Sequence, residues 1–176
     1  AIEVGELTPA YAVSSEDGLA PMERMAPDVR FLYLLRDPVE RLWSHVRMIS
    51  ARRDDDGRVT ERRTAAILRR TLAGEETQIA ARSDYAGTLA RLSAAVPAPK
   101  VLIDVFEDMV QGTGLDRICA FLGISPMAGD MSPAHTGQPL AMTGAQLREA
   151  RDWLSPQYEA AQVALGRRPD AWQWEG

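Results

Sequence analysis

The most regular hydrophobic pattern in this chain lies between residues 29 and 48. Residues 31–35, FLYLL, form a short run of aromatic and large aliphatic side chains, which predicts a strand buried on both faces. The run ends before Asp37-Pro38, where a proline fits the first turn of a helix and the aspartate fits its N-cap. Apolar side chains then recur at helical spacing and predict an amphipathic helix over 39–52.

Arg36 lies at the junction of this strand and helix, and Ser44 follows within two turns of the predicted helix. In open α/β sheets, ligands bind at the carboxyl ends of the strands. An arginine there can hold a phosphate through two hydrogen bonds, and a serine hydroxyl can donate to the same group. The alternative for Arg36 is a surface ion pair with Asp37 or Glu40, and the alternative for Ser44 is a plain helix-surface serine.

The rest of the chain has the pattern of one continuous α/β unit. A second buried strand is predicted at 100–106, KVLIDVF, and residues 1–4 have the pattern of a strand end. The polar segments 14–21 and 125–140 are rich in turn residues and predict loops. Apolar spacing predicts further helices at 21–25, 64–73, 85–95, 115–122, Thr143 to Trp153 and Pro156 to Leu165, with Thr143 and Gln146 as a capping box.

Composition narrows the classes of function. The chain of 176 residues is long enough for one domain with a substantial core, and its 45% apolar and 26% charged residues are typical of soluble globular proteins. The formal charge of −5 argues against nucleic-acid binding, which usually requires a basic surface. No apolar run approaches the roughly 18 residues of a membrane-spanning helix, so we expect a cytoplasmic protein without a transmembrane segment. The single cysteine, Cys119, has the pattern of a buried structural thiol.

The spacing of Arg36 and Ser44 carries a specific resemblance. An arginine, seven intervening residues and a serine, within LRDPVERLWSH, resemble the 3′-phosphate-binding segment of sulfotransferases. These enzymes use 3′-phosphoadenosine 5′-phosphosulfate (PAPS) as the sulfuryl donor, and the similarity is greatest to their bacterial and heparan-type branch. The resemblance implies that Arg36 and Ser44 bind the 3′-phosphate of the donor.

Two further segments are similar to motifs of the same family. Residues 5–11, GELTPAY, resemble the family's GEKSxxY segment, which implies that Glu6 is the catalytic base. A carboxylate suits this role because the hydroxyl of an acceptor has a pKa far above 7 and must lose its proton. Leu7 stands where the family often has lysine, and Tyr11 would line the acceptor pocket or the core. Residues 82–92, RSDYAGTLARL, resemble the SxYxxxLxxW segment, which implies that Tyr85 lies near the donor or the acceptor.

The resemblance continues through the second strand and the ICAFLGI stretch at 118–124, and it weakens after residue 125. Where some members carry an RKGxxG phosphate-binding segment, this chain has HTGQP, so the backbone around Gly137 is the candidate for a phosphate contact. His45 projects about 100° from Ser44 around the helix. It is therefore a candidate for acceptor binding, and a histidine without a function is the alternative.

The resemblance implies a three-layer fold like that of P-loop NTPases, with a central parallel sheet flanked by helices. The sequence predicts only two or three strands, and it contains no Gly-Lys loop for the 5′-phosphosulfate. We therefore expect residues 1–176 to be a single, partial sulfotransferase domain, whose first strand and loop lie upstream of this sequence.

The function implied by the resemblance is transfer of a sulfuryl group from PAPS to a hydroxyl or amine of a small-molecule or carbohydrate acceptor. Adenosine 3′,5′-bisphosphate would be the product, and no metal is expected. One alternative is a non-catalytic sulfotransferase-like domain that binds a nucleotide or a partner. Another is a P-loop nucleotide kinase, which would need a lysine loop and a magnesium-binding acid that this sequence does not contain.

Overall fold

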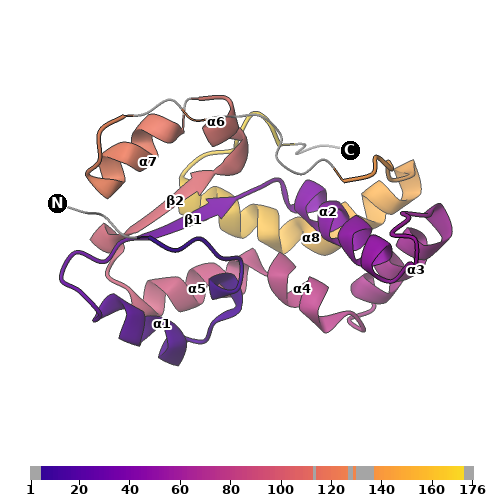
Figure 1. Cartoon of the computed structure of the whole chain (residues 1–176), viewed down its shortest axis with the longest axis horizontal. Helices are drawn as coiled ribbons and strands as arrows, with labels where there is room; N and C mark the ends of the chain where they lie inside the picture. Colours follow the sequence, from indigo (N-terminus) through magenta and orange to yellow (C-terminus); the bar gives the residue numbers. More distant parts are fainter. Residues whose placement is uncertain (1–4, 113, 127–128, 130–136, 173–176) are drawn as a thin grey trace.

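The protein is represented by a computed structural model that describes residues 5–112, 114–126, 129 and 137–172. Within these ranges, two strands lie among many helices (Figure 1). In chain order the elements are η1 (Tyr11–Val13), α1 (Glu16–Glu23), β1 (Phe31–Leu35), α2 (Pro38–Arg52), α3 (Glu61–Leu72), α4 (Thr77–Ser83), α5 (Tyr85–Ala95), η2 (Ala98–Lys100), β2 (Val101–Val105), α6 (Phe106–Val110), α7 (Leu115–Leu122) and α8 (Gly144–Leu165).

The two strands pair in parallel, with Phe31 opposite Val101 and Leu35 opposite Val105. Side chains on one face of this pair pack against α1 and α5 through a cluster that includes Leu19 and Leu92. On the other face, Asp104 accepts hydrogen bonds from the guanidinium of Arg117 in α7. Figure 1 shows α1 and α5 on one side of the strands and α6 and α7 on the other.

The larger core lies beyond the carboxyl ends of the strands. It joins the end of β1 to α2, α3, α4 and α8, and its fully buried members include Leu35, Leu42, Val46 and Leu154, each 0% exposed. This packing fixes the direction in which α2 leaves the sheet. The structure is therefore a helix-rich α/β fold with a small parallel sheet, and the three-layer P-loop-like arrangement stays a prediction.

The predicted β1–α2 junction is confirmed. Phe31–Leu35 forms the strand, Pro38 is the first residue of α2, and the Asp37 Oδ1 atom accepts from the Glu40 backbone N–H at 2.9 Å. The second strand, the helices at 85–95 and 115–122, and the Thr143–Gln146 capping box are also confirmed. The strand expected at residues 1–4 lies outside the described residues.

Several predicted boundaries were wrong. The helix predicted at 64–73 begins at Glu61 and ends at Leu72. Residues 14–21 were expected to form a loop and 21–25 a helix, but α1 begins at Glu16, because the Ser15 side chain accepts from the Gly18 backbone N–H at 3.2 Å and caps it. A break was expected at Pro156, but α8 continues through it. Proline removes one helical hydrogen bond, and a buried stripe on both sides of it (Ala150, Leu154, Tyr158 and Ala161) holds the helix together.

Among the residues that the structure describes, no helix is both long and apolar enough to cross a membrane. The same residues contain no group of three or more histidine, cysteine, aspartate or glutamate side chains that could hold a metal ion. Cys119 is buried, as its pattern predicted.

Candidate functional site

The backbone at the end of β1 is held from three other helices. The Tyr85 hydroxyl at the start of α5 donates to the carbonyl of Arg36 at 2.9 Å. The next backbone N–H, that of Asp37, donates to the Glu107 carboxylate of α6 at 3.1 Å. The Oδ2 atom of the Asp37 side chain accepts from the Tyr158 hydroxyl of α8 at 2.9 Å. Arg36 therefore extends from a backbone whose position is fixed.

The guanidinium of Arg36 is 37% exposed, and its contacts with carboxylates of the described residues are long. Its Nη2 atom lies 3.5 Å from Glu40, and its Nε atom lies 3.9 Å from Glu107. The group also lies over the ring of Phe106, 5.8 Å from the ring centre. The surface ion pair with Glu40 that the sequence offered as an alternative is thus present. Ion pairs this exposed contribute little free energy, so a phosphate can replace these carboxylates.

Ser44 is half-buried in the second turn of α2, and its hydroxyl makes no hydrogen bond to any residue that the structure describes. One turn further on, Arg47 donates from Nη1 to the carbonyl of Gln138 at 3.3 Å. The buried Nε atom of Arg47 has no hydrogen-bond partner within the described ranges. At three-residue spacing these two side chains lie on adjacent parts of the helix surface, so both can reach one anion.

The segment after Gly137 packs against α2. The Trp43 indole donates to the carbonyl of Leu140, and the Gln138 side chain accepts from the Val59 backbone N–H at 2.8 Å. Gly137 itself is exposed, and no described atom lies within 4 Å of the position where a Cβ would stand. The structure thus brings the candidate Gly137 backbone beside the helix that carries Ser44. Sequence reasoning missed Arg47, although its one-turn spacing from Ser44 was a usable signal.

Glu6 and Tyr11, predicted as the catalytic base and an acceptor contact, lie together. The Tyr11 hydroxyl donates to Glu6 Oε2 at 2.6 Å, and both side chains are exposed. This hydrogen bond, more than any other contribution, raises the pKa of Tyr11 above its ordinary value of 10.0. The phenol therefore keeps its proton at neutral pH and can orient the carboxylate.

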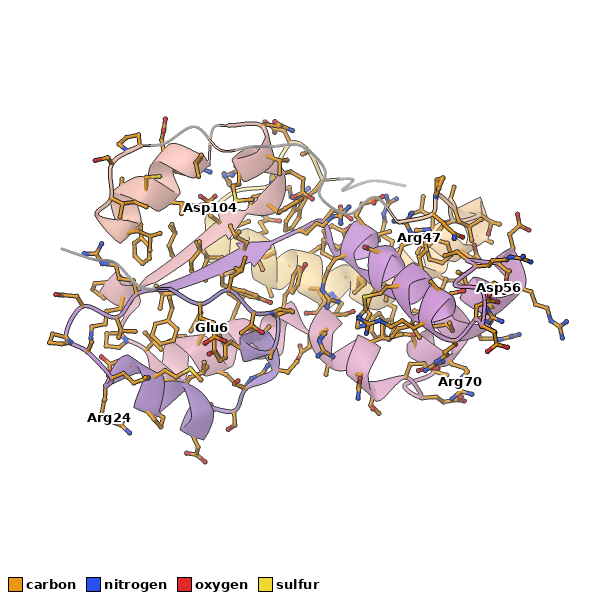
Figure 2. All side chains as sticks on the ribbon, viewed as in Figure 1. Glu6, Arg24, Arg47, Asp56, Arg70 and Asp104 are labelled. Carbon is orange, nitrogen blue, oxygen red and sulfur yellow. The ribbon has the colours of Figure 1, made fainter. Side chains whose placement is uncertain are left out.

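Helix α5 links this pair to the strand end. The carbonyl of Ala12 accepts from the Thr88 hydroxyl at 2.8 Å and from Arg91 at 3.0 Å, which docks η1 on the same helix that begins with Tyr85. A shallow hollow of about 300 Å³ lies beside η1, lined by Val13, Ser14, Ser15, Ala81, Asp84 and Arg91. Figure 2 shows Glu6 on the side of α1 and α5, and Arg47 along α2. Within the described residues, no hydrogen bond or ion pair joins Glu6 to Arg36.

Tyr85 and His45 have surroundings that the sequence did not predict. Tyr85 is 3% exposed, so it contacts the backbone of Arg36 from within the core. The Nδ1 atom of His45 is buried and has no hydrogen-bond partner among the described residues. Burial, and then the nearby guanidinium groups of Arg41, Arg82 and Arg52, lower the pKa of His45 to about 4. His45 is therefore a neutral imidazole at physiological pH.

No protein-family description matches this sequence, and no curated protein matches it. Solved structures do match its fold. The crystal structure of a sulfotransferase from Alicyclobacillus acidocaldarius aligns with a TM-score of 0.65 and 24% sequence identity. The alignment covers 92% of this chain and 64% of that one, so this chain spans less than two thirds of the sulfotransferase. The alignment shows that this helix-rich α/β chain has a sulfotransferase-like fold. Arg36 lies at the end of one of its two described strands.

Proposed function

We propose that this protein is a sulfotransferase, which moves the sulfuryl group of PAPS to a hydroxyl or amine of a small-molecule or carbohydrate acceptor. The observation that carries this proposal is the accessible Arg36 guanidinium at the carboxyl end of β1, within a sulfotransferase-like fold. Ligands of open α/β sheets bind at this end of the strands. The likeness to the Alicyclobacillus acidocaldarius sulfotransferase supports the reaction class.

Arg36 and Ser44 would bind the 3′-phosphate of the donor. The carboxylate contacts of Arg36, at 3.5 and 3.9 Å, are long enough to be exchanged for a phosphate, which carries more charge and accepts two parallel hydrogen bonds. The Ser44 hydroxyl has no competing hydrogen bond among the described residues and would donate to the same group. Arg47 and the backbone N–H of Gly137 would close the site where the Gln138 segment packs on α2, and Tyr85 would position Arg36.

Glu6 would act as the base. One of its oxygens accepts from Tyr11, which leaves the other oxygen for the acceptor hydroxyl. As the acceptor oxygen bonds to sulfur, the bond between sulfur and the 5′-phosphate oxygen breaks, and the acceptor proton passes to the Glu6 carboxylate. Adenosine 3′,5′-bisphosphate then leaves. Positioning of donor and acceptor in line supplies most of the catalysis, as in phosphoryl transfer. We assign no residue of this chain to the 5′-phosphosulfate.

Thermal unfolding with adenosine 3′,5′-bisphosphate tests the donor site, with adenosine 5′-monophosphate as the ligand control. A ligand that binds only the folded protein stabilises it by about 2.7 kcal/mol at a hundredfold excess over Kd. We expect a larger upward shift with the 3′-phosphorylated nucleotide than with adenosine 5′-monophosphate, and we expect Arg36→Ala to abolish the difference. Arg62→Ala is the matched control, because Arg62 is an exposed arginine of α3. Absence of a shift at millimolar nucleotide would contradict the proposal.

A further inference from the structure

Arg41 in α2 is a partly buried cation, and the groups that act most on its pKa, namely Tyr85, Tyr33 and Arg82, are neutral or positive. Its Nη1 atom donates to the Ser83 hydroxyl of α4 at 3.0 Å, and it has no ion pair with a carboxylate among the described residues. Burial is the main cause that lowers its pKa, and Arg82 lowers it further. Removing a guanidinium from water costs free energy that is usually offset by an acidic partner. The surroundings of Arg41 therefore favour an anion.

Two further groups lie with Arg41 to form what we call the basic cluster, namely His45 and Arg82. His45 follows Arg41 by one helical turn, and its buried Nδ1 atom has no partner among the described residues. Arg82 extends from α4, which packs against α2, and it acts on both other members of the cluster electrostatically. Arg52 adds positive charge from the far end of α2. A neutral imidazole still has one N–H to donate.

The acidic side chains near the basic cluster along the chain have other partners. Glu40, next to Arg41, pairs with Arg36 at 3.5 Å. Asp84, which follows Ser83, accepts from the Gly87 backbone N–H at 2.9 Å and pairs with Arg91 at 3.9 Å. Glu76, just before α4, binds Arg53 at 2.8 Å. In the part of the chain that the structure describes, none of these three carboxylates forms an ion pair with the basic cluster, whose charge therefore remains to attract an anion from outside the chain.

The basic cluster and Arg47 lie on different flanks of α2, and Ser44 lies between them, three residues from Arg41 and three from Arg47. At about 100° per residue, His45 and Arg47 point about 160° apart around the helix. Arg47 faces the segment at Gln138, whereas Arg41 faces α4. Helix α4 also contacts η1, and Ala81 and Asp84 on either side of Arg82 line the hollow beside η1. The cluster is therefore on the side of the molecule that carries Tyr11 and Glu6.

We propose that Arg41, Arg82 and His45 bind an acidic group of the acceptor, a carboxylate or a sulfate, so that the acceptor of this enzyme is itself an anion. This inference rests on the proposed sulfotransferase function. The two guanidinium groups supply charge-assisted hydrogen bonds, and the imidazole N–H supplies a third donor. Because the basic cluster and Glu6 lie on the same side of the molecule, an acceptor bound by its acidic group would have its hydroxyl on the side of Glu6.

Histidine NMR of the full-length protein tests this directly. The chain has two histidines, and the imidazole signal that disappears in His45→Gln belongs to His45. We expect glucuronate and methyl sulfate to shift this signal saturably, and glucose to leave it unchanged. Arg41→Gln and Arg82→Gln should each raise the half-saturating concentration about tenfold, the effect of losing one charge-assisted hydrogen bond. Arg62→Gln, which removes the same charge from α3, should have no effect. If neither anion shifts the signal saturably, the inference is wrong.

A parallel titration with adenosine 3′,5′-bisphosphate separates this inference from the proposed function. The expected result is that the nucleotide binds, and that Arg82→Gln leaves its affinity unchanged. If the nucleotide binds but the anions do not, the acidic-acceptor inference fails while the sulfotransferase proposal stands. If the anions bind only by competing with the nucleotide, and Arg36→Ala abolishes both, they occupy the donor site and the inference fails. If the anions bind and the nucleotide does not, the sulfotransferase proposal and the acceptor assignment fail together.

Discussion

The Tyr85 hydroxyl donates a hydrogen bond to the backbone carbonyl of Arg36, at 2.9 Å, across 49 residues of sequence. Tyr85 is the first residue of α5, and its ring packs edge-on against Tyr33 of β1, with ring centres 6.1 Å apart. Both contacts tie the start of α5 to the end of the strand. The candidate phosphate-binding arginine thus depends for its position on a buried side chain from another helix.

Replacing Tyr85 by phenylalanine removes this hydrogen bond and keeps the ring packing. We expect Tyr85→Phe to lower the free energy of unfolding by about 1–3 kcal/mol, because it leaves a part-buried carbonyl without its donor. Affinity for adenosine 3′,5′-bisphosphate should also fall, since Arg36 is held less firmly. Denaturant unfolding and calorimetry measure the two effects. Tyr11→Phe is the stability control, because Tyr11 is exposed, and equal stability of the two variants would contradict the prediction.

The strand-to-helix junction could be predicted because its signals are local. The apolar run Phe31–Leu35, the Asp37 cap and Pro38 follow one another in sequence, and each acts on its immediate neighbours. The same holds for the capping box at Thr143. The Tyr85–Arg36 contact could not be predicted in this way, because it depends on how α5 packs beneath the strands.

The continuation of α8 and the basic cluster were missed for the same kind of reason. A proline at position 156 predicts a break from local rules, and only the core shows that Leu154 and Tyr158 are buried on one stripe across it. Arg41 and Arg82 are 41 positions apart in sequence and meet because α2 packs on α4. A single sequence does not show that charged residues of two separate helices lie close together.

Pro156 gives a stability prediction away from the candidate site. It is exposed within α8, where a proline interrupts the helical hydrogen bonds and alanine would restore them. We expect Pro156→Ala to raise the free energy of unfolding by about 1–3 kcal/mol. Thermal and denaturant unfolding would measure the gain, and nucleotide affinity should not change. A loss of stability would mean that α8 is bent around the proline in a way that the core requires.

The pairing of Glu76 with Arg53 predicts that the fold loses stability in acid. Its carboxylate binds both terminal nitrogens of Arg53 at 2.8 Å, and this pairing is the main cause that lowers its pKa below the ordinary value of 4.5. A carboxylate with a depressed pKa stabilises the fold above its unfolded pKa, and the stabilisation is lost as the pH falls through the folded pKa. The stability advantage of the natural protein over Glu76→Gln should therefore shrink below about pH 4.5.

Denaturant unfolding between pH 3 and pH 7 measures this difference, with Glu159→Gln as the control, because Glu159 is exposed on α8. An advantage of constant size over this range would show that the pairing with Arg53 does not govern the titration of Glu76.

The lowered pKa of His45 predicts a loss of folding stability over a second range of pH. Its pKa is about 4 in the folded protein, against an ordinary value of 6.5, chiefly because of burial. Between these values the unfolded chain binds more protons, so the stability that depends on neutral His45 declines as the pH falls from 6.5 towards 4. His45→Gln should have a flatter stability profile over this range. An unchanged slope in the variant would mean that His45 titrates alike in both states.

Arg47 is the sharpest test of where the donor phosphate binds. It lies one turn beyond Ser44 on α2, and its buried Nε atom has no partner among the described residues. If the 3′-phosphate lies between Ser44 and the Gln138 segment, Arg47→Ala should weaken adenosine 3′,5′-bisphosphate binding about tenfold, and Arg47→Lys should recover part of the loss. Isothermal titration calorimetry gives the affinities, with Arg62→Ala as the matched arginine control.

The Arg47 variant also distinguishes a phosphate contact from a purely structural role. Arg47 donates to the carbonyl of Gln138 at 3.3 Å, so its loss can loosen the segment beside α2. Loosening would weaken every nucleotide that uses the site, whereas loss of a contact to the 3′-phosphate weakens only ligands that carry it. A tenfold loss confined to the 3′-phosphorylated nucleotide therefore assigns Arg47 to the donor site. An equal loss for adenosine 5′-monophosphate would leave Arg47 as a support for the Gln138 segment.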